Sequence, residues 1–385
     1  MQKKLIALAV AAAFSAPAFA DVTMYGNVDA GVIHSSADGL KSDFQAVSGG
    51  LSPSRLGVKG AEDLGNGMKA VVVLEYGLDN ATNSAIGSVG AGTANSVARQ
   101  QMLALAGDWG TVATGLLQTT GYDWAMKFDP TAESAVSPLQ TVTKGFVIGS
   151  NTVGARAQRA LAYISPDMGG VTVAVNYSTS LTGIGDLGTP STAAIQDKST
   201  AALVSATYNG GPLSVGVVYA GATLGNTYLQ TVTPATYTST LSTTDIALGA
   251  SYDFTVVKLF GTYQTSKTGT NNIVTVGSDN KAYSLGVVAP VGPGAIAFSY
   301  AKNSIGTNGT LAGLTHVGTG TDQNANGYTV AWLQGLSKTT TFYAAVNKVS
   351  QGVNTAQYST LNNALAGGQA GGGSTLLAVG LNKKF

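Results

Sequence analysis

The sequence lacks cysteine and is poor in charge: only 10% of its 385 residues are Asp, Glu, Lys or Arg. Without cysteine, disulfides, thiolate metal sites and cysteine nucleophiles are all excluded. Only two histidines, His34 and His316, are present, too few for a histidine-rich metal site. Soluble proteins usually carry about 25% charged residues. We therefore expect part of the surface to face something other than water.

The charge balance is nearly neutral, with a formal net charge of +1. A nucleic-acid partner held through phosphate contacts would need a basic surface, so none is expected. No glycine-rich phosphate motif followed by Lys and Ser or Thr occurs, and no serine, histidine and acid are marked as a catalytic trio. The sequence predicts neither an enzyme nor a protein that needs a cofactor or metal.

The N-terminus has the pattern of an export signal. Lys3 and Lys4 precede an apolar run over residues 5–13, and Ala18-Phe19-Ala20 fits a small-x-small cleavage site. The run is too short for a membrane-spanning helix, which needs about 20 apolar residues. We predict that residues 1–20 are a signal peptide cleaved before Asp21, and that residues 21–385 form one domain.

Long apolar runs are missing after residue 20, although 44% of the residues are hydrophobic. The apolar residues alternate with polar ones instead, as in a strand with one apolar face. A strand of about 9–11 such residues spans a membrane within a closed barrel. The alternation is clearest over residues 22–32, 69–79, 171–177, 213–219 and 377–385.

Turn-forming residues interrupt this alternating pattern, and their number predicts the number of strands. Seven tight turns rich in Gly, Pro, Asn and Asp would join fourteen strands, and the first and last strands would pair to close the sheet. The sequence thus predicts an all-β fold, a 16-stranded antiparallel transmembrane β-barrel with short turns at one rim. The turns fall at residues 62–67, 107–110, 165–170, 209–212, 252–255, 290–294 and 334–337, and long polar loops at 34–53, 79–97, 120–155, 178–200, 221–243, 266–280, 302–326 and 349–373.

Several segments, in this order and spacing, resemble the trimeric Gram-negative general porins of the β-proteobacterial and neisserial type. They are residues 21–29, 54–67, Arg99-Gln100, 107–112, 162–166 and the terminal Phe385. The resemblance implies an outer-membrane location, short periplasmic turns, long external loops and a third loop, residues 120–155, folded into the lumen. It also implies a homotrimer in contact with outer-membrane lipid and lipopolysaccharide. Phe385 is implied to be the assembly signal for the barrel-assembly machinery.

Charged residues mark a candidate constriction. The third loop would contribute an acidic wall, Asp123, Asp129 and Glu133. An arginine facing lipid at mid-depth costs roughly 2–4 kcal/mol, so strand arginines are expected to point inward. Arg55 and Lys59 have the same strand parity and are expected on the same face. Arg99 matches the Arg-Gln position of the family that the sequence resembles. One of Arg156 and Arg159 is expected at the narrowest level. Asp29 and Glu75 take the polar parity and are expected to face the lumen or to pair with these arginines.

The sequence therefore predicts a channel for passive diffusion of small hydrophilic solutes and ions. Size would be sieved at the third loop, and opposed charges would give a weak preference for anions. Two alternatives remain at this point. One is a substrate-selective channel built on the same barrel, and the other is an adhesive or structural surface barrel that acts through its long loops.

Overall fold

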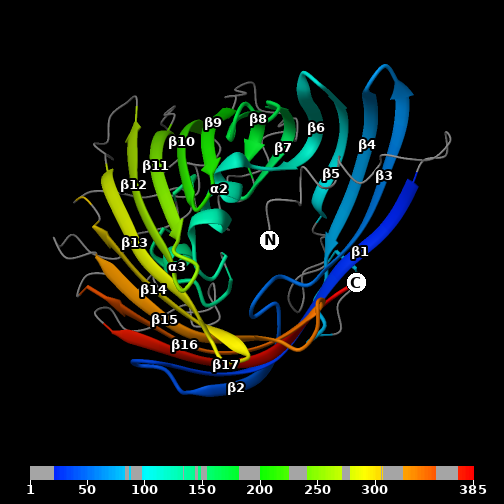
Figure 1. Ribbon diagram of the computed structural model, residues 1–385. Helices are drawn as coiled ribbons and strands as arrows, with labels where there is room; N and C mark the ends of the chain where they lie inside the picture. The colour runs from blue at the N-terminus through cyan, green and yellow to red at the C-terminus, as the bar shows by residue number, and fades with distance from the viewer. Residues whose placement is uncertain are drawn as a thin grey trace, which may run out of the picture.

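The computed structural model describes twelve stretches of the chain: residues 21–82, 86–87, 98–132, 134–143, 146–148, 154–181, 200–224, 241–270, 278–304, 306, 324–352 and 372–385. The predicted signal peptide, residues 1–20, lies outside them. Within the described residues, no helix is long and apolar enough to cross a membrane. The described strands form a single sheet that closes on itself (Figure 1).

Antiparallel strands make up the barrel wall, and each except the short second strand pairs with the next strand along the chain. The first half of the sheet consists of β1 (Asp21–Ala37), β2 (Asp43–Ser48), β3 (Arg55–Gly65), β4 (Met68–Gly77), β5 (Ala98–Gly107), β6 (Gly110–Gln118), β7 (Arg156–Ile164), β8 (Val171–Leu181) and β9 (Thr200–Gly210). The second half consists of β10 (Leu213–Leu224), β11 (Leu241–Asp253), β12 (Lys258–Thr270), β13 (Ser278–Val291), β14 (Gly294–Ser304), β15 (Ala325–Gly335), β16 (Thr340–Gln351) and β17 (Gly373–Lys384). All seven predicted tight turns fall between strands that pair as hairpins.

The barrel closes through β1, which pairs with β17 along one edge. Along its other edge, the first residues of β1 pair with β3 up to Asn27 opposite Arg55, and later residues pair with β2. The predicted closed ring of sixteen strands is thereby confirmed. The short β2, which lies inside the predicted loop 34–53, is an addition. It occupies the edge of β1 that β3 leaves unpaired, which removes an open sheet edge.

The two faces of the wall differ as the alternation predicted. Side chains that point outward are apolar and exposed, among them Val22, Met24, Leu74, Val217 and Val379. Inward side chains are small or polar and mostly buried, because the lumen is partly filled. A continuous apolar outer surface is the signature of a barrel embedded in lipid.

The lumen is partly filled by the connection between β6 and β7, which we call loop 3. Loop 3 contains helices α2 (Thr120–Phe128) and α3 (Pro138–Val142), and both lie inside the ring of strands (Figure 1). The third loop therefore folds into the lumen, as the resemblance implied. Thr119 caps α2 through its side chain, which accepts a hydrogen bond from the amide of Tyr122, and Ser137 caps α3 in the same way.

Candidate functional site

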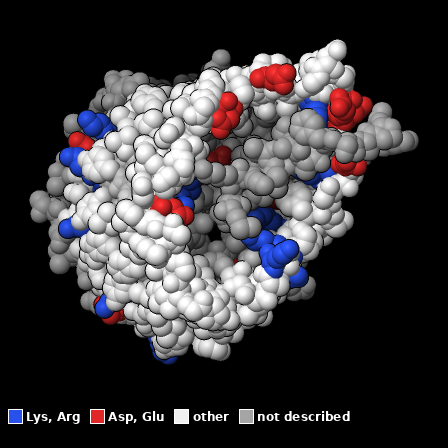
Figure 2. Space-filling view, in the orientation of Figure 1, with Lys and Arg blue, Asp and Glu red and all other residues white. Residues whose placement is uncertain are grey.

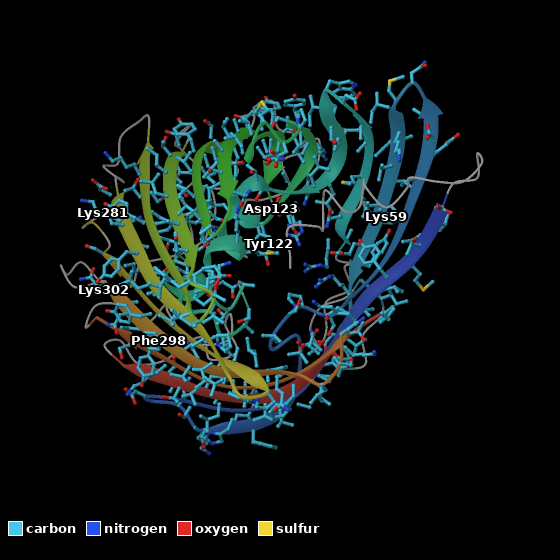
Figure 3. The ribbon with its side chains drawn as sticks, viewed as in Figure 1. Lys59, Tyr122, Asp123, Lys281, Phe298 and Lys302 are labelled. Atoms are coloured by element: carbon cyan, nitrogen blue, oxygen red, sulfur yellow. The ribbon has the colours of Figure 1, made fainter. Side chains whose placement is uncertain are left out.

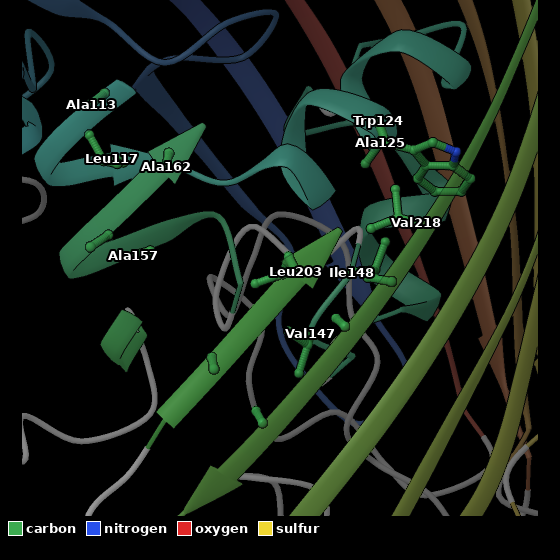
Figure 4. Close-up of a cluster of buried hydrophobic side chains, with 14 of the residues drawn as sticks. Ala113, Leu117, Trp124, Ala125, Val147, Ile148, Ala157, Ala162, Leu203 and Val218 are labelled. Carbon is green, nitrogen blue, oxygen red and sulfur yellow. The ribbon is translucent and has the colours of Figure 1, made fainter. Parts of the chain in front are cut away.

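Loop 3 is attached to one half of the barrel wall. Its helix α2 packs Trp124 and Phe128 against the inner faces of β10 and β11 at Gly216 and Gly249, and the Trp124 indole donates a hydrogen bond of 3.1 Å to the Gly216 carbonyl. Around them lies a buried cluster with Leu203, Val218 and Ile148 (Figure 4). The apolar face of α2 is therefore turned to the wall rather than to water.

Polar contacts attach further described residues of loop 3 to the same side. The Asp245 carboxylate on β11 accepts hydrogen bonds from the amides of Val147 and Ile148. Asn303 on β14 donates to the Val142 carbonyl at 2.8 Å, and Asn347 on β16 donates to the Val136 carbonyl at 3.1 Å. Because these contacts run from β10 to β16, the remaining passage lies between loop 3 and the strands β1 and β3 to β5.

The opposite side of the passage carries a cluster centred on Glu75. One Glu75 oxygen accepts a hydrogen bond from Arg99 Nε at 2.8 Å, and the other accepts one from the Tyr25 hydroxyl at 3.1 Å and lies 3.6 Å from Arg55 Nε. The Glu75 side chain is 6% exposed, whereas those of Arg55 and Arg99 are 23% and 18% exposed. Glu75 thus holds two guanidinium groups at the lumen edge.

Arg99 reaches this cluster through an irregularity in the sheet. Glu75 pairs with Gln100 and Tyr76 with Ala98, so Arg99 is an extra residue without a partner in the register. By simple alternation Arg99 would share the outward face of Gln101 and the exposed Leu103. A bulge redirects a side chain, and here it turns Arg99 toward Glu75.

Arg156, at the end of loop 3, joins the cluster from the side. Its Nε donates to the Arg99 carbonyl at 2.8 Å, and its guanidinium lies 5.0 Å from the centre of the Tyr122 ring. Asp123, the next residue on α2, accepts a hydrogen bond from the Gln118 amide. Figure 3 shows Tyr122 and Asp123 inside the ring of strands. Burial raises the pKa of Asp123, and Arg156 and Gln118 partly oppose this, so the carboxylate loses its charge at a higher pH than an exposed aspartate does.

The other predicted constriction residues lie elsewhere. Lys59 is on the inward face of β3, four residues from Arg55 toward the short turn. Arg159 is exposed at a positive φ of 49° and shares strand parity with the exposed Leu161 and Tyr163, so it lies on the outer face and not beside Arg156.

The acidic residues predicted on loop 3 also differ in placement. Asp129 ends α2 and accepts hydrogen bonds from the amide and hydroxyl of Thr131. Glu133 lies outside the described residues.

Asp29 is buried in the wall rather than lining the passage. Its carboxylate accepts hydrogen bonds from the amides of Leu51 and Ser52 at 3.2 and 3.0 Å, and from the Tyr343 hydroxyl and the Asn382 amide group at 2.8 Å each. These partners come from the first loop, β16 and β17. Asp29 therefore ties the first loop to the seam where the barrel closes.

The sequence alone did not identify the two glycines on the barrel wall that accommodate the aromatic side chains of loop 3. A Cβ atom at Gly216 would come within 2.6 Å of the Phe128 ring, and one at Gly249 would come within 2.6 Å of the same ring and 2.9 Å of Trp124. These glycines leave room for the aromatic side chains. Glycine inside a strand signals close approach of another group, but the sequence does not show which group approaches.

A comparison with family models decides where the chain belongs. The model of the family described as Gram-negative porin matches residues 7–354. The chain belongs to this family. The porin is similar to outer membrane porin protein 32 of Delftia acidovorans, with 29% identity over 395 residues and complete coverage of both chains. It is also similar to an outer membrane porin protein of Bordetella pertussis, with 27% identity over 89% of this chain and 93% of the relative.

Solved structures give the same fold for the porin. The anion-selective porin from Comamonas acidovorans matches with a TM-score of 0.72 and 24% identity, over 95% of this chain and 100% of that one. OmpT of Vibrio cholerae in its trimer form matches with a TM-score of 0.65 and 13% identity, over 95% and 99%. The protein is an outer-membrane channel of a Gram-negative bacterium, through which small hydrophilic solutes and ions diffuse.

Proposed function

We propose that Arg55, Arg99 and Arg156, facing Asp123 on α2, form the narrowest section of this porin and give it a weak preference for anions. The observation that carries the proposal is the charge balance of the cluster, in which three guanidinium groups stand against the carboxylates of Glu75 and Asp123. Basic (blue) atoms lie beside the central opening in Figure 2. Low-dielectric walls strengthen the field of such a cluster.

The mechanism follows from two roles of the same residues. Loop 3 sets the size limit, since its contacts with the wall hold it in one place. The guanidinium groups lower the free energy of an anion at the narrowest point and raise that of a cation. Lys59 adds a second basic position about 13 Å further along β3, at about 3.3 Å per residue. The test is the reversal potential of single channels in a salt gradient.

The preference is expected to be mild, because Glu75 and Asp123 offset part of the positive charge. A similar solved porin bears the description anion-selective, which agrees with the proposed sign. The net charge of the mature chain favours neither anions nor cations, since its positive and negative charges nearly cancel. Only charge within a Debye length of about 8–10 Å influences an ion in physiological salt.

We also propose that the porin forms a homotrimer. A similar solved outer membrane protein is described as a trimer form, and the exposed apolar outer face offers surface that neighbouring barrels can bury. A mass of three chains is expected in mild detergent. A single-chain mass that persists at high protein concentration would contradict the trimer.

Phe385 is proposed as the assembly signal, and its contacts indicate a second role in closing the seam. Its amide and carbonyl form hydrogen bonds of 3.2 and 3.1 Å with Gly26 on β1, and its ring covers Gly26 so closely that a Cβ there would overlap it. Deleting Phe385 should reduce the yield of heat-modifiable barrel severalfold, measured by electrophoretic shift. The matched control Phe254→Ala, an exposed aromatic at a short turn, should assemble normally, and equal yields would contradict the role of Phe385.

A further inference from the structure

The guanidinium group of Arg55 is held from two sides. On the wall side, its Nε lies 3.6 Å from a carboxylate oxygen of Glu75. On the other side, its Nη1 donates hydrogen bonds to the Ser52 hydroxyl at 3.1 Å and to the Pro53 carbonyl at 2.9 Å. These two acceptors keep the guanidinium from closing fully on Glu75.

The two acceptors belong to residues 49–54, the connection between β2 and β3, which we call the inner segment. We propose that Asp29, on the neighbouring strand β1, is a positioning residue for Arg55. Asp29 holds the inner segment, and the inner segment holds the guanidinium. This inference deepens the proposed function and rests on it, because Arg55 is one of the arginines placed at the narrowest section.

Asp29 binds the inner segment through both its side chain and its backbone. Its carboxylate accepts hydrogen bonds from the amides of Leu51 and Ser52 at 3.2 and 3.0 Å. Its backbone amide donates to the Ser54 hydroxyl at 2.9 Å, and its carbonyl accepts from the amide of Gly49 at 3.0 Å. One residue thus contacts the beginning, the middle and the end of the inner segment.

The position of Asp29 is fixed in turn by the strands that close the barrel. The Tyr343 hydroxyl on β16 and the Asn382 side-chain amide on β17 each donate to the Asp29 carboxylate at 2.8 Å, and Asp29 is fully buried. A buried carboxylate needs such donors to offset its lost hydration. Since β17 pairs with β1 to close the sheet, the place of Arg55 depends on the closed barrel. A functional group supported in this way keeps its geometry better than one on a free loop.

The inner segment has little room to move away from this support. A Cβ atom at Gly50 would overlap the Tyr343 hydroxyl, so the chain at Gly50 packs directly on that side chain. The carbonyls of Ser52 and Pro53 also accept hydrogen bonds from the Asn27 side-chain amide at 3.2 and 3.1 Å. The Pro53 carbonyl is thereby shared by two donors, and a shift of the inner segment would weaken both hydrogen bonds.

The expected effect of the variant D29A has a sign that separates positioning from charge. Removing a negative charge from the wall would by itself raise the preference for anions. If Asp29 acts by position, D29A releases the inner segment, and the Arg55 guanidinium closes on Glu75, which then neutralises it more fully. The ratio of anion to cation permeability should then fall roughly twofold, less than the effect of about fivefold that a whole unit charge would have.

D29N removes the same charge but should preserve the position. Its amide oxygen can still accept from the amides of Leu51 and Ser52, while its NH2 group faces the Tyr343 hydroxyl, which can act as an acceptor. The reversal potential of D29N in a salt gradient should therefore stay near that of the wild type. The matched control D253A removes an aspartate that accepts a hydrogen bond from the Thr255 amide at an exposed short turn, and its reversal potential should also be unchanged.

Two further measurements connect the effect to Arg55. R55Q alone should lower the permeability ratio, and adding D29A to R55Q should have no further effect, because the group that Asp29 positions is gone. In crystal structures of the single variants, Arg55 Nη1 should stay within hydrogen-bond distance of the Pro53 carbonyl in D29N and lie beyond about 3.5 Å from it in D29A. This distance does not depend on the ion preference.

Three results would overturn the proposal: a permeability ratio that rises in both D29A and D29N, an equal effect of D29A with and without R55Q, or an unchanged contact between Arg55 and Pro53 in D29A. If R55Q leaves the reversal potential unchanged, the proposed function fails, and the crystal structures then decide the positioning role alone. If D29A does not assemble, D29S gives the same readouts, since its smaller polar side chain leaves a site that water can fill.

Discussion

Replacing Arg55 and Arg99 together with glutamine should change the porin from weakly anion-preferring to cation-preferring. The double variant leaves Arg156 as the one basic member of the cluster, against the carboxylates of Glu75 and Asp123. A unit charge about 4 Å away contributes about 1 kcal/mol even in bulk water, which is about a fivefold effect on one ion. Because two charges are removed, the ratio of anion to cation permeability should fall at least about fivefold. The measurement is the reversal potential of single channels across a salt gradient.

Arg159→Gln is the matched control for this experiment. It removes the same kind of charge from a neighbouring strand position, but Arg159 is exposed on the outer face of β7. Its reversal potential should equal that of the wild type. If the double variant shifts the reversal potential no more than Arg159→Gln does, the arginine cluster does not line the conducting passage.

Replacing Gly249 with valine should force loop 3 away from the wall and narrow the channel. The new Cβ would lie 2.6 Å from two atoms of the Phe128 ring and 2.9 Å from Trp124, so α2 must move toward the lumen. Overpacking of this kind typically costs about 1–3 kcal/mol. We expect a lower single-channel conductance, together with a lower unfolding temperature in the heat-modifiability assay.

Gly261→Val on the next strand is the control for that change. The atom nearest to a Cβ at Gly261 is Leu285 Cδ2 at 3.8 Å, an ordinary contact. This variant carries the same β-branched side chain in a strand but does not touch loop 3. If the two valine variants had the same single-channel conductance and the same unfolding temperature, the packing of loop 3 against Gly249 would not control the width of the channel.

The fold was predictable because the signals that define it are local. Alternation fixed which side of β4 faces lipid, and Gly, Pro, Asn and Asp marked all seven short turns. The extra strand β2 was missed, since its pairing depends on where β3 stops pairing with β1. That boundary is a property of two segments and is not visible in either one alone.

The site was less predictable than the fold because its geometry depends on departures from alternation. A bulge turns Arg99 inward against the alternation of its strand, and the sequence does not show this irregularity. Arg159, in contrast, has the parity of the exposed Leu161 and Tyr163 and lies on the outer face, where alternation alone places it. Asp29 and Asp129 have the expected residue type, but their carboxylates are used by hydrogen bonds within the protein. Charge and strand parity identify candidate residues. The hydrogen bonds and ion pairs that these residues form in the folded protein then decide which charges can interact with an ion in the channel.

The reversal potential of the unmodified porin across a tenfold KCl gradient is the most direct test of the proposed constriction. Potassium and chloride have nearly equal mobilities in water, so a nonzero potential reports the field inside the channel. The three arginines predict the sign at which chloride carries the larger share of the current. A potential of zero, or of the sign at which potassium dominates, would contradict the proposal that this cluster controls the narrowest section.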